Sequence, residues 1–219
     1  MKWEKRKGSE PEKNTQPLSD PVQSGRIAQK KLVCIGTSTG GPRALQTVLS
    51  SLPGNLEAPV LVVQHMPSGF TKSLANRLNA ISNIRVKEAE DGEMLKPGAV
   101  YIAPGDFHMG VEAHGAHLFI QLEQSAPVNG HRPAVDKTFE SVSMLKNYET
   151  LAVIMTGMGS DGTKGLIALK NRGHVRAIVE AEESCIVYGM PRSAIAAKVV
   201  DEVLPLEKIA EAIMKFISD

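Results

Sequence analysis

Residues 32–42 read LVCIGTSTGGP, an apolar run that ends in a stretch of glycine, serine and threonine. A continuous apolar run closed by glycine is typical of a strand buried on both faces of a parallel sheet. Residues 42–52 (PRALQTVLSSL) follow and carry leucine and valine at helical spacing. The stretch therefore predicts a buried strand, a tight turn and a helix.

A second strand–helix pair comes directly afterwards. Residues 59–65 (PVLVVQH) are strand-like, and residues 68–79 (SGFTKSLANRLN) place Phe70, Leu74 and Leu78 on one helical stripe. Two such units in succession favour an α/β fold with a doubly wound, mostly parallel sheet and flanking helices. A further strand at Leu151–Met155 and a last helix near Leu206–Ile217 continue the pattern.

Residues 84–122 depart from this rhythm. The segments IRVKEA, AVYIAP, FHMGVEA and AHLFIQL are short and β-like, and turn signals such as Asp91-Gly92 and Pro97-Gly98 separate them. We expect all of them to form a small antiparallel β excursion, followed by a helix over Ala134–Lys146.

Composition excludes several classes of function. The formal net charge is +1 and only 4% of residues are aromatic, which gives no support to nucleic acid as a partner. No apolar run approaches the roughly 20 residues of a membrane span, and the charged N-terminus is not followed by an apolar segment. We expect no direct membrane insertion and a cytoplasmic location, with Cys34 and Cys185 as buried, reduced thiols.

Residues 1–30 have a different composition from the rest of the chain. They are rich in serine, proline, glutamine and charge, and poor in apolar side chains. Such a segment buries too little surface to offset the entropy of ordering. We expect a flexible tail or interdomain linker at 1–30 and one domain at 31–219.

The turn Gly36–Gly40 matches the G-x-S-x-G pattern around Ser38. Glycines on both sides of a serine allow a sharp strand-to-helix turn that exposes the hydroxyl, and the helix N-terminus favours a developing oxyanion. The alternative is a phosphate-binding loop, since that site uses the same geometry. Neither G-x-x-x-x-G-K-[ST] nor G-x-G-x-x-G occurs, so a nucleophilic Ser38 is the better interpretation.

His65 and Asp161 each follow a predicted strand. The carboxyl ends of neighbouring parallel strands line one crevice, so both side chains are expected to face Ser38. His65 would act as general base, and Asp161 would orient its imidazole. A structural hydrogen bond is the alternative for His65, and a helix N-cap remains equally open for Asp161. The order Ser–His–Asp differs from that of α/β-hydrolases.

The remaining polar clusters are given simpler interpretations. His108, His114, His117 and His131 are expected to be solvated loop residues, because period-2 strands would scatter them and no metal-binding spacing occurs. The run from Glu180 to Glu183 is expected to be an exposed acidic loop.

Six stretches, taken together, resemble a known family: IGTSTGGP, VVQHMPSGFT, VYIAPGDFHM, HRPAVDKTFESV, TGMGSDGTKG and VYGMPRSA. In this order they are similar to the motifs of the CheB protein-glutamate methylesterases of bacterial chemotaxis, from about Leu32 to the C-terminus. The resemblance implies a doubly wound α/β domain whose catalytic serine, histidine and aspartate are Ser38, His65 and Asp161. It also implies that Thr39 and Met158 lie in the loops that bind the oxyanion.

The resemblance further implies an activity. Members of the family hydrolyse glutamate γ-methyl esters on the cytoplasmic helices of methyl-accepting chemotaxis receptors and deamidate certain receptor glutamines, without a cofactor or metal. Most carry an N-terminal receiver domain, and residues 1–30 resemble the linker that follows it. The chain is then either an excised catalytic domain or a member without control by phosphorylation. The segment RAIVEAEES lacks the glutamine–aspartate pair common at that place. We expect a monomer, and the alternative function is a receptor-docking module without catalysis.

Overall fold

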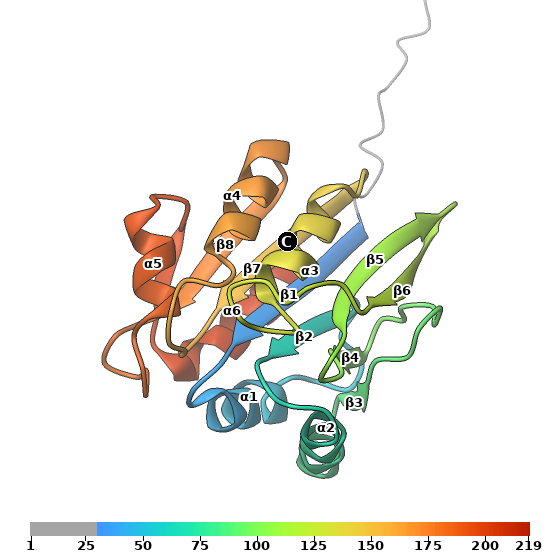
Figure 1. Cartoon of the computed structure of the whole chain (residues 1–219), viewed down its shortest axis with the longest axis horizontal. Helices are drawn as coiled ribbons and strands as arrows, with labels where there is room; N and C mark the ends of the chain where they lie inside the picture. Colours follow the sequence, from blue (N-terminus) through green and yellow to red (C-terminus); the bar gives the residue numbers. More distant parts are fainter. Residues whose placement is uncertain (1–29) are drawn as a thin grey trace, which may run out of the picture.

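The computed structural model describes residues 30–219, which form a central parallel sheet covered by helices on both faces (Figure 1). Seven strands form the sheet in the order β3-β4-β2-β1-β7-β8-β9. Their bounds are β1 Lys30–Thr37, β2 Val60–Gln64, β3 Arg85–Glu88, β4 Ala99–Ile102, β7 Tyr148–Ile154, β8 Val175–Glu180 and β9 Glu202–Leu204. Every neighbouring pair in this sheet is parallel, which confirms the predicted fold class.

Helices cover the sheet in two layers. Their bounds are α1 Gly41–Ser50, α2 Phe70–Ile81, α3 Val135–Ser143, α4 Thr163–Arg172, α5 Met190–Ala196 and α6 Leu206–Ser218. The apolar sides of α1, α2 and α6 form one hydrophobic core with one face of the sheet. The other face packs against α3, α4 and α5 and against a separate hairpin of β5 (His108–His114) and β6 (His117–Glu123).

The central strand β1 supplies both cores. Val33 and Ile35 belong to the core on the α1 side, whereas Leu32 and Cys34 belong to the core on the α3 side. All of them are fully buried, and burying an aliphatic side chain contributes about 1.5–3 kcal/mol. Burial on both faces explains why this strand is a continuous apolar run instead of an alternating one.

The topology creates one crevice at the carboxyl end of the sheet. From β1 the chain crosses to β2 on one side, and β7 lies on the other side of β1. Gly36 aligns with Val63 of β2 and with Ile154 of β7, so the three strands end at the same level. Ligands of doubly wound sheets bind at such a switch point, beyond the carboxyl ends of the strands.

The antiparallel excursion is smaller than the sequence predicts. Among the strands of the described residues only β5 and β6 pair antiparallel, with an isolated antiparallel bridge between Met94 and Phe119, whereas β3 and β4 pair parallel to one another and extend the main sheet. Short strands separated by turn residues carry no information on direction, so the prediction for the first two segments was wrong. Helix α3 also ends at Ser143, three residues before the expected end.

Among the described residues, no helix is both long and apolar enough to cross a membrane. Cys34 is buried and Cys185 is half-buried, and both are free thiols. The flexible tail predicted for residues 1–30 lies outside the described residues, apart from Lys30, which begins β1.

We predict that Gly165→Ala destabilises the protein by about 1–3 kcal/mol, the usual cost of overpacking. Helices α3 and α4 meet at Gly165, where an added Cβ would lie 2.6 Å from the Cβ of Phe139 and 2.8 Å from the carbonyl oxygen of Asp136. Urea unfolding measures the change. The matched control is Lys164→Ala, at an exposed position of the same helix, which should leave stability within about 0.5 kcal/mol. Equal stability of the two variants would contradict the close helix contact.

Candidate active site

Ser38 follows the last residue of β1 and is fixed by its backbone. Its N–H donates to the carbonyl oxygen of Thr156 at 3.0 Å, and its own carbonyl accepts from Gln64 Nε2 at 2.9 Å. Gly40 adopts a left-handed φ of 86°, which lets the chain turn sharply into α1. The turn holds the Ser38 hydroxyl at the carboxyl end of the central strand.

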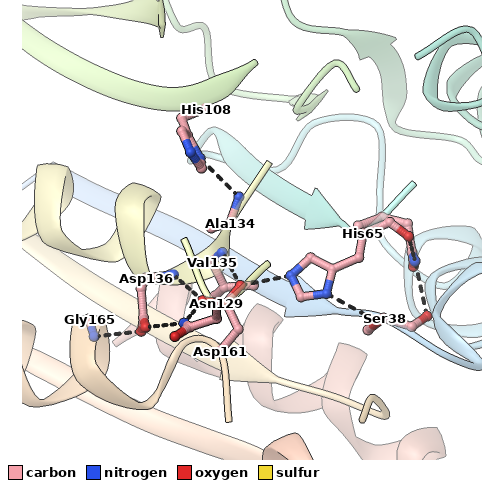
Figure 2. Close-up of polar contacts among 10 residues, drawn as sticks. Ser38, His65, His108, Asn129, Ala134, Val135, Asp136, Asp161 and Gly165 are labelled. Atoms are coloured by element: carbon pink, nitrogen blue, oxygen red, sulfur yellow. Dashed lines mark hydrogen bonds and ion pairs between the residues drawn. The ribbon is translucent and has the colours of Figure 1, made fainter. Parts of the chain in front are cut away.

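His65 follows β2 and bridges the other two predicted site residues. Its backbone N–H donates to the carbonyl oxygen of Thr37 at 3.2 Å, which ties the end of β2 to the end of β1. The imidazole Nδ1 lies 3.1 Å from Ser38 Oγ, and Nε2 lies 2.7 Å from Asp161 Oδ2. Figure 2 shows the three side chains in one line, as the strand-end positions predict.

Asp161 lies in the loop between β7 and α4, and only 2% of it is exposed. Besides His65, it accepts hydrogen bonds from the backbone N–H groups of Val135 at 2.6 Å and Asp136 at 3.1 Å, and from Asn129 Nδ2 at 3.1 Å (Figure 2). Val135 and Asp136 are the first residues of α3, so Asp161 caps a helix N-terminus from a distant segment. The N-cap alternative was therefore correct in kind, but the capped helix is α3 and not α4.

These contacts set the charge of Asp161. Burial raises the pKa of the carboxyl, but the hydrogen bonds from His65, Val135 and Asp136 outweigh burial and leave the pKa below its ordinary value. Asp161 is therefore ionised at neutral pH and only accepts hydrogen bonds. His65 must then carry its proton on Nε2, which leaves the lone pair of Nδ1 facing the Ser38 hydroxyl.

This arrangement has the geometry of a serine hydrolase triad, but the two nitrogens of the imidazole exchange their partners. In the serine-protease triad Nε2 faces the serine and Nδ1–H faces the aspartate. Here Nδ1 faces Ser38 and Nε2–H donates to Asp161. The reversed orientation still places a proton acceptor beside Ser38, because either nitrogen of a neutral imidazole accepts a proton when the other is held as a donor.

A second buried carboxyl, Asp136, lies next to Asp161. It accepts from the backbone N–H of Gly165 at 2.8 Å and from Asn129 Nδ2 at 2.9 Å. Burial, together with the negative charge of Asp161, raises the pKa of Asp136 above its ordinary value. The Asn129 amide therefore donates to both carboxyls at once and separates them (Figure 2).

The histidine predictions were partly wrong. His108 is 1% exposed, and its Nδ1 accepts from the Ala134 N–H at 3.2 Å, just before α3 (Figure 2). The imidazole of His131 stacks on that of His65, with ring centroids 3.8 Å apart and planes inclined by 12°. His114 and His117 are exposed on the hairpin, as expected.

Sequence reasoning missed Asn129, Asp136 and the place of His131. One signal was available: Asn129-Gly130 is a strong two-residue turn motif, and His131 follows it directly, with Asp136 further along the chain. A turn motif predicts local backbone geometry and does not say which distant element the turn contacts.

The prediction that Glu180 lies in an exposed acidic loop was also wrong. It is the last residue of β8, is fully buried, and accepts from the Thr156 N–H at 2.8 Å through Oε2. Burial raises the pKa of this carboxyl. Thr156 in turn donates through its hydroxyl to the carbonyl oxygen of Thr39 at 2.9 Å, so Glu180 supports the turn around Ser38.

Thr39 and Met158 lie beside the serine. Thr39 follows Ser38, and Met158 follows Gly157, where an added Cβ would lie 2.9 Å from the Ser38 Cβ. The Met158 side chain is 68% exposed. Among residues 30–219 neither backbone N–H donates to another protein group. In the same range, no three His, Cys, Asp or Glu side chains gather in a metal-binding arrangement.

Comparison with known proteins shows the family of this chain. Residues 33–213 match the family model described as CheB methylesterase. The chain belongs to the CheB methylesterase family. Ser38, His65, Asp161, Thr39 and Met158 all lie within the matched range.

Relatives and a solved structure agree with the family. The protein-glutamate methylesterase/protein-glutamine glutaminase of Halalkalibacterium halodurans is 55% identical over 199 residues, 91% of this chain and 56% of the relative. The Bacillus subtilis protein of the same name is 54% identical over 84% of this chain and 52% of its own length. The crystal structure of the Thermotoga maritima CheB methylesterase catalytic domain matches with a TM-score of 0.82 at 51% identity, over 85% of this chain and 98% of that domain.

The chain thus spans about half the length of the curated relatives it matches. It matches nearly the whole of the solved catalytic domain.

We predict that Asp161→Asn lowers stability at neutral pH by about 1–3 kcal/mol, because the amide leaves donors around it unsatisfied. The folded pKa of Asp161 lies below the unfolded value of about 3.9, so its contribution is fully present above about pH 4. The contribution is lost as pH falls through the lowered folded pKa. Urea unfolding of both proteins at pH 7 and pH 3 should show the difference shrinking at acid pH. A constant or growing difference would reject a stabilising, ionised Asp161.

Proposed function

We propose that this chain is a serine esterase that hydrolyses glutamate γ-methyl esters on chemoreceptors, with Ser38 as nucleophile, His65 as general base and Asp161 as the group that orients His65. One observation carries the proposal: the hydrogen-bonded line from Ser38 Oγ through His65 to Asp161, at 3.1 and 2.7 Å. The shared names of the relatives supply the substrate class.

The reaction proceeds by acyl transfer to the serine and then to water. Ser38 Oγ attacks the γ-carbonyl carbon of the ester while His65 Nδ1 takes the hydroxyl proton. The tetrahedral intermediate collapses, and the same nitrogen returns the proton to the departing methoxide, which leaves as methanol. A water molecule then cleaves the γ-glutamyl ester of Ser38 by the same sequence of proton transfers, leaving a free carboxylate.

Two backbone N–H groups are the best donors to the oxyanion. The N–H of Ser38 is occupied by the Thr156 carbonyl, so this site does not use the nucleophile's own amide as trypsin-like enzymes do. We assign the role to the N–H groups of Thr39 and Met158, which flank the serine and have no protein acceptor among the described residues. Met158 needs no particular side chain for this role, which agrees with its exposure.

Deamidation of receptor glutamines follows from the same steps. A glutamine γ-amide presents the same carbonyl carbon to Ser38, and His65 protonates ammonia in place of methanol. The names of the relatives include this second activity. We also assign the protein to the cytoplasm, where receptor helices with these side chains are found in the family.

The docking-module alternative makes a different prediction. A module that binds receptors without catalysis has no need for an ionised aspartate, a fixed imidazole tautomer and a serine in one hydrogen-bonded line. It predicts receptor binding with no methanol release, which the following experiment separates.

We predict that Ser38→Ala abolishes methanol release from a methylated chemoreceptor cytoplasmic fragment, with kcat lower by about 10⁴-fold or more. The change removes only one oxygen from a half-buried side chain, so the fold should be kept. Gas chromatography of released methanol measures the rate, and circular dichroism checks folding.

Thr163→Ala is a control at the start of α4, since Thr163 belongs to the same region but its hydroxyl makes no hydrogen bond to the three triad side chains among the described residues. It should release methanol within about threefold of wild type. If Ser38→Ala keeps more than a tenth of the wild-type rate, Ser38 is not the nucleophile. If wild type binds the fragment but releases nothing, the docking alternative replaces this proposal.

We further propose that the domain predicted at residues 31–219, together with Lys30 at the start of β1, suffices for catalysis. A chain that begins at Lys30 keeps all of β1 and every contact of the site. We predict a kcat within about twofold, and a melting temperature within about 2 °C, of the values for the full chain, because the composition of residues 1–29 offers few apolar side chains that could add stability. A large loss of either would show that the preceding residues belong to the domain.

A further inference from the structure

The turn between β6 and α3 has a well-defined backbone conformation. Val128 and His131 exchange backbone hydrogen bonds, with nitrogen-to-oxygen distances of 3.0 and 2.9 Å. Asn129 and Gly130 at its tip both have positive φ, 52° and 79°. A two-residue turn of this kind strongly prefers Asn-Gly, so the backbone here is defined by the sequence. We call residues 128–131 the Asn-Gly turn.

The Asn-Gly turn places two side chains on the triad. Asn129 Nδ2 donates to Asp161 Oδ1 at 3.1 Å, on the carboxylate oxygen that His65 does not use. His131 lays its ring on the imidazole of His65, nearly parallel and 3.8 Å away between centroids. One short turn therefore contacts both the base and the group that orients it.

The geometry of His131 fits packing and not proton transfer. Both nitrogens of His65 are already engaged, one by Ser38 and the other by Asp161, so His131 has no place in the proton path. Burial and the neighbouring His65 lower the pKa of His131, so its ring is neutral at neutral pH. A neutral ring stacks on the imidazole without repelling the positive charge that His65 gains during the reaction.

We infer that His131 is a positioning residue: its ring holds the His65 imidazole in the one plane where Nδ1 faces Ser38 while Nε2 faces Asp161. This inference rests on the proposed function. Rotation of the imidazole about its Cβ–Cγ bond would break both hydrogen bonds, and the stacked ring blocks that rotation from one face. Displacement of a reacting group by about 1 Å costs on the order of 10²-fold in rate.

The test compares two substitutions at one position. His131→Ala removes the stacked ring, and we expect kcat for methyl ester hydrolysis to fall about 10- to 100-fold with KM within about twofold. His131→Phe restores a flat ring without any titratable nitrogen, and we expect kcat within about threefold of wild type. His114→Ala, an exposed histidine on the hairpin, is the control and should leave kcat unchanged.

A spectroscopic readout separates positioning from simple stability. In ¹⁵N spectra of the histidine rings, wild type and His131→Phe should show His65 protonated at Nε2 alone, whereas His131→Ala should show exchange broadening of the His65 signals. Phosphonylation of Ser38 by a fluorophosphonate should slow in parallel with kcat. Neither readout needs the receptor. If the fluorophosphonate reacts with Ser38 of the wild type but the wild type does not hydrolyse the methyl ester, the proposed substrate is wrong. The spectra and the phosphonylation rates of the variants would still test the role of His131.

Two results would overturn the inference. If His131→Ala reacts as fast as wild type and keeps sharp His65 signals, the stack has no positioning role. If His131→Phe is as slow as His131→Ala although its melting temperature and His65 spectrum match wild type, a ring nitrogen of His131 takes part in the chemistry instead.

Discussion

The buried carboxylate of Asp161 is the point to which the rest of the site is attached. It accepts hydrogen bonds from the imidazole after β2, from the first turn of α3 and from the Asn-Gly turn before that helix. Segments that are distant in sequence therefore meet at one charge. Because a buried charge is costly unless it is satisfied, any shift of α3 or of the turn would act directly on the His65 imidazole.

The same charge explains the local packing of the helices. Stabilising an ionised Asp161 requires the N-terminus of α3, so α3 must lie close to the loop that begins α4. That proximity brings Asp136 against Gly165, where only glycine fits, and leaves a second carboxyl beside the first. The raised pKa of Asp136 and the lowered pKa of Asp161 are two results of one arrangement, in which backbone N–H groups and the imidazole favour the charge of Asp161.

The sequence predicts the parts of this site that lie on strand ends. Ser38, His65 and Asp161 each follow an apolar run. Parallel strands bring their carboxyl ends together regardless of how the helices pack on the sheet. The contacts of Asn129 and His131 depend on how a loop folds back over the sheet, which no period in the sequence encodes. The direction of β3 and the burial of Glu180 were missed for the same reason, because both are decided by distant partners: β4 for the strand and Thr156 for the carboxyl.

The site is buried on the Asp161 side and exposed on the Ser38 side. This asymmetry suits the proposed substrate, which is a side chain on the surface of another folded protein. Asp161 is buried and accepts several hydrogen bonds, whereas Thr39 and Met158 are exposed beside Ser38. In the reaction proposed above, a glutamyl ester on a receptor helix could approach such an edge without unfolding of either protein. The carboxylate of Asp161 stays shielded from water, and in the proposed mechanism only Ser38 and the N–H groups beside it contact the substrate. Preorganisation of this kind is effective because the donors are fixed before the negative charge develops.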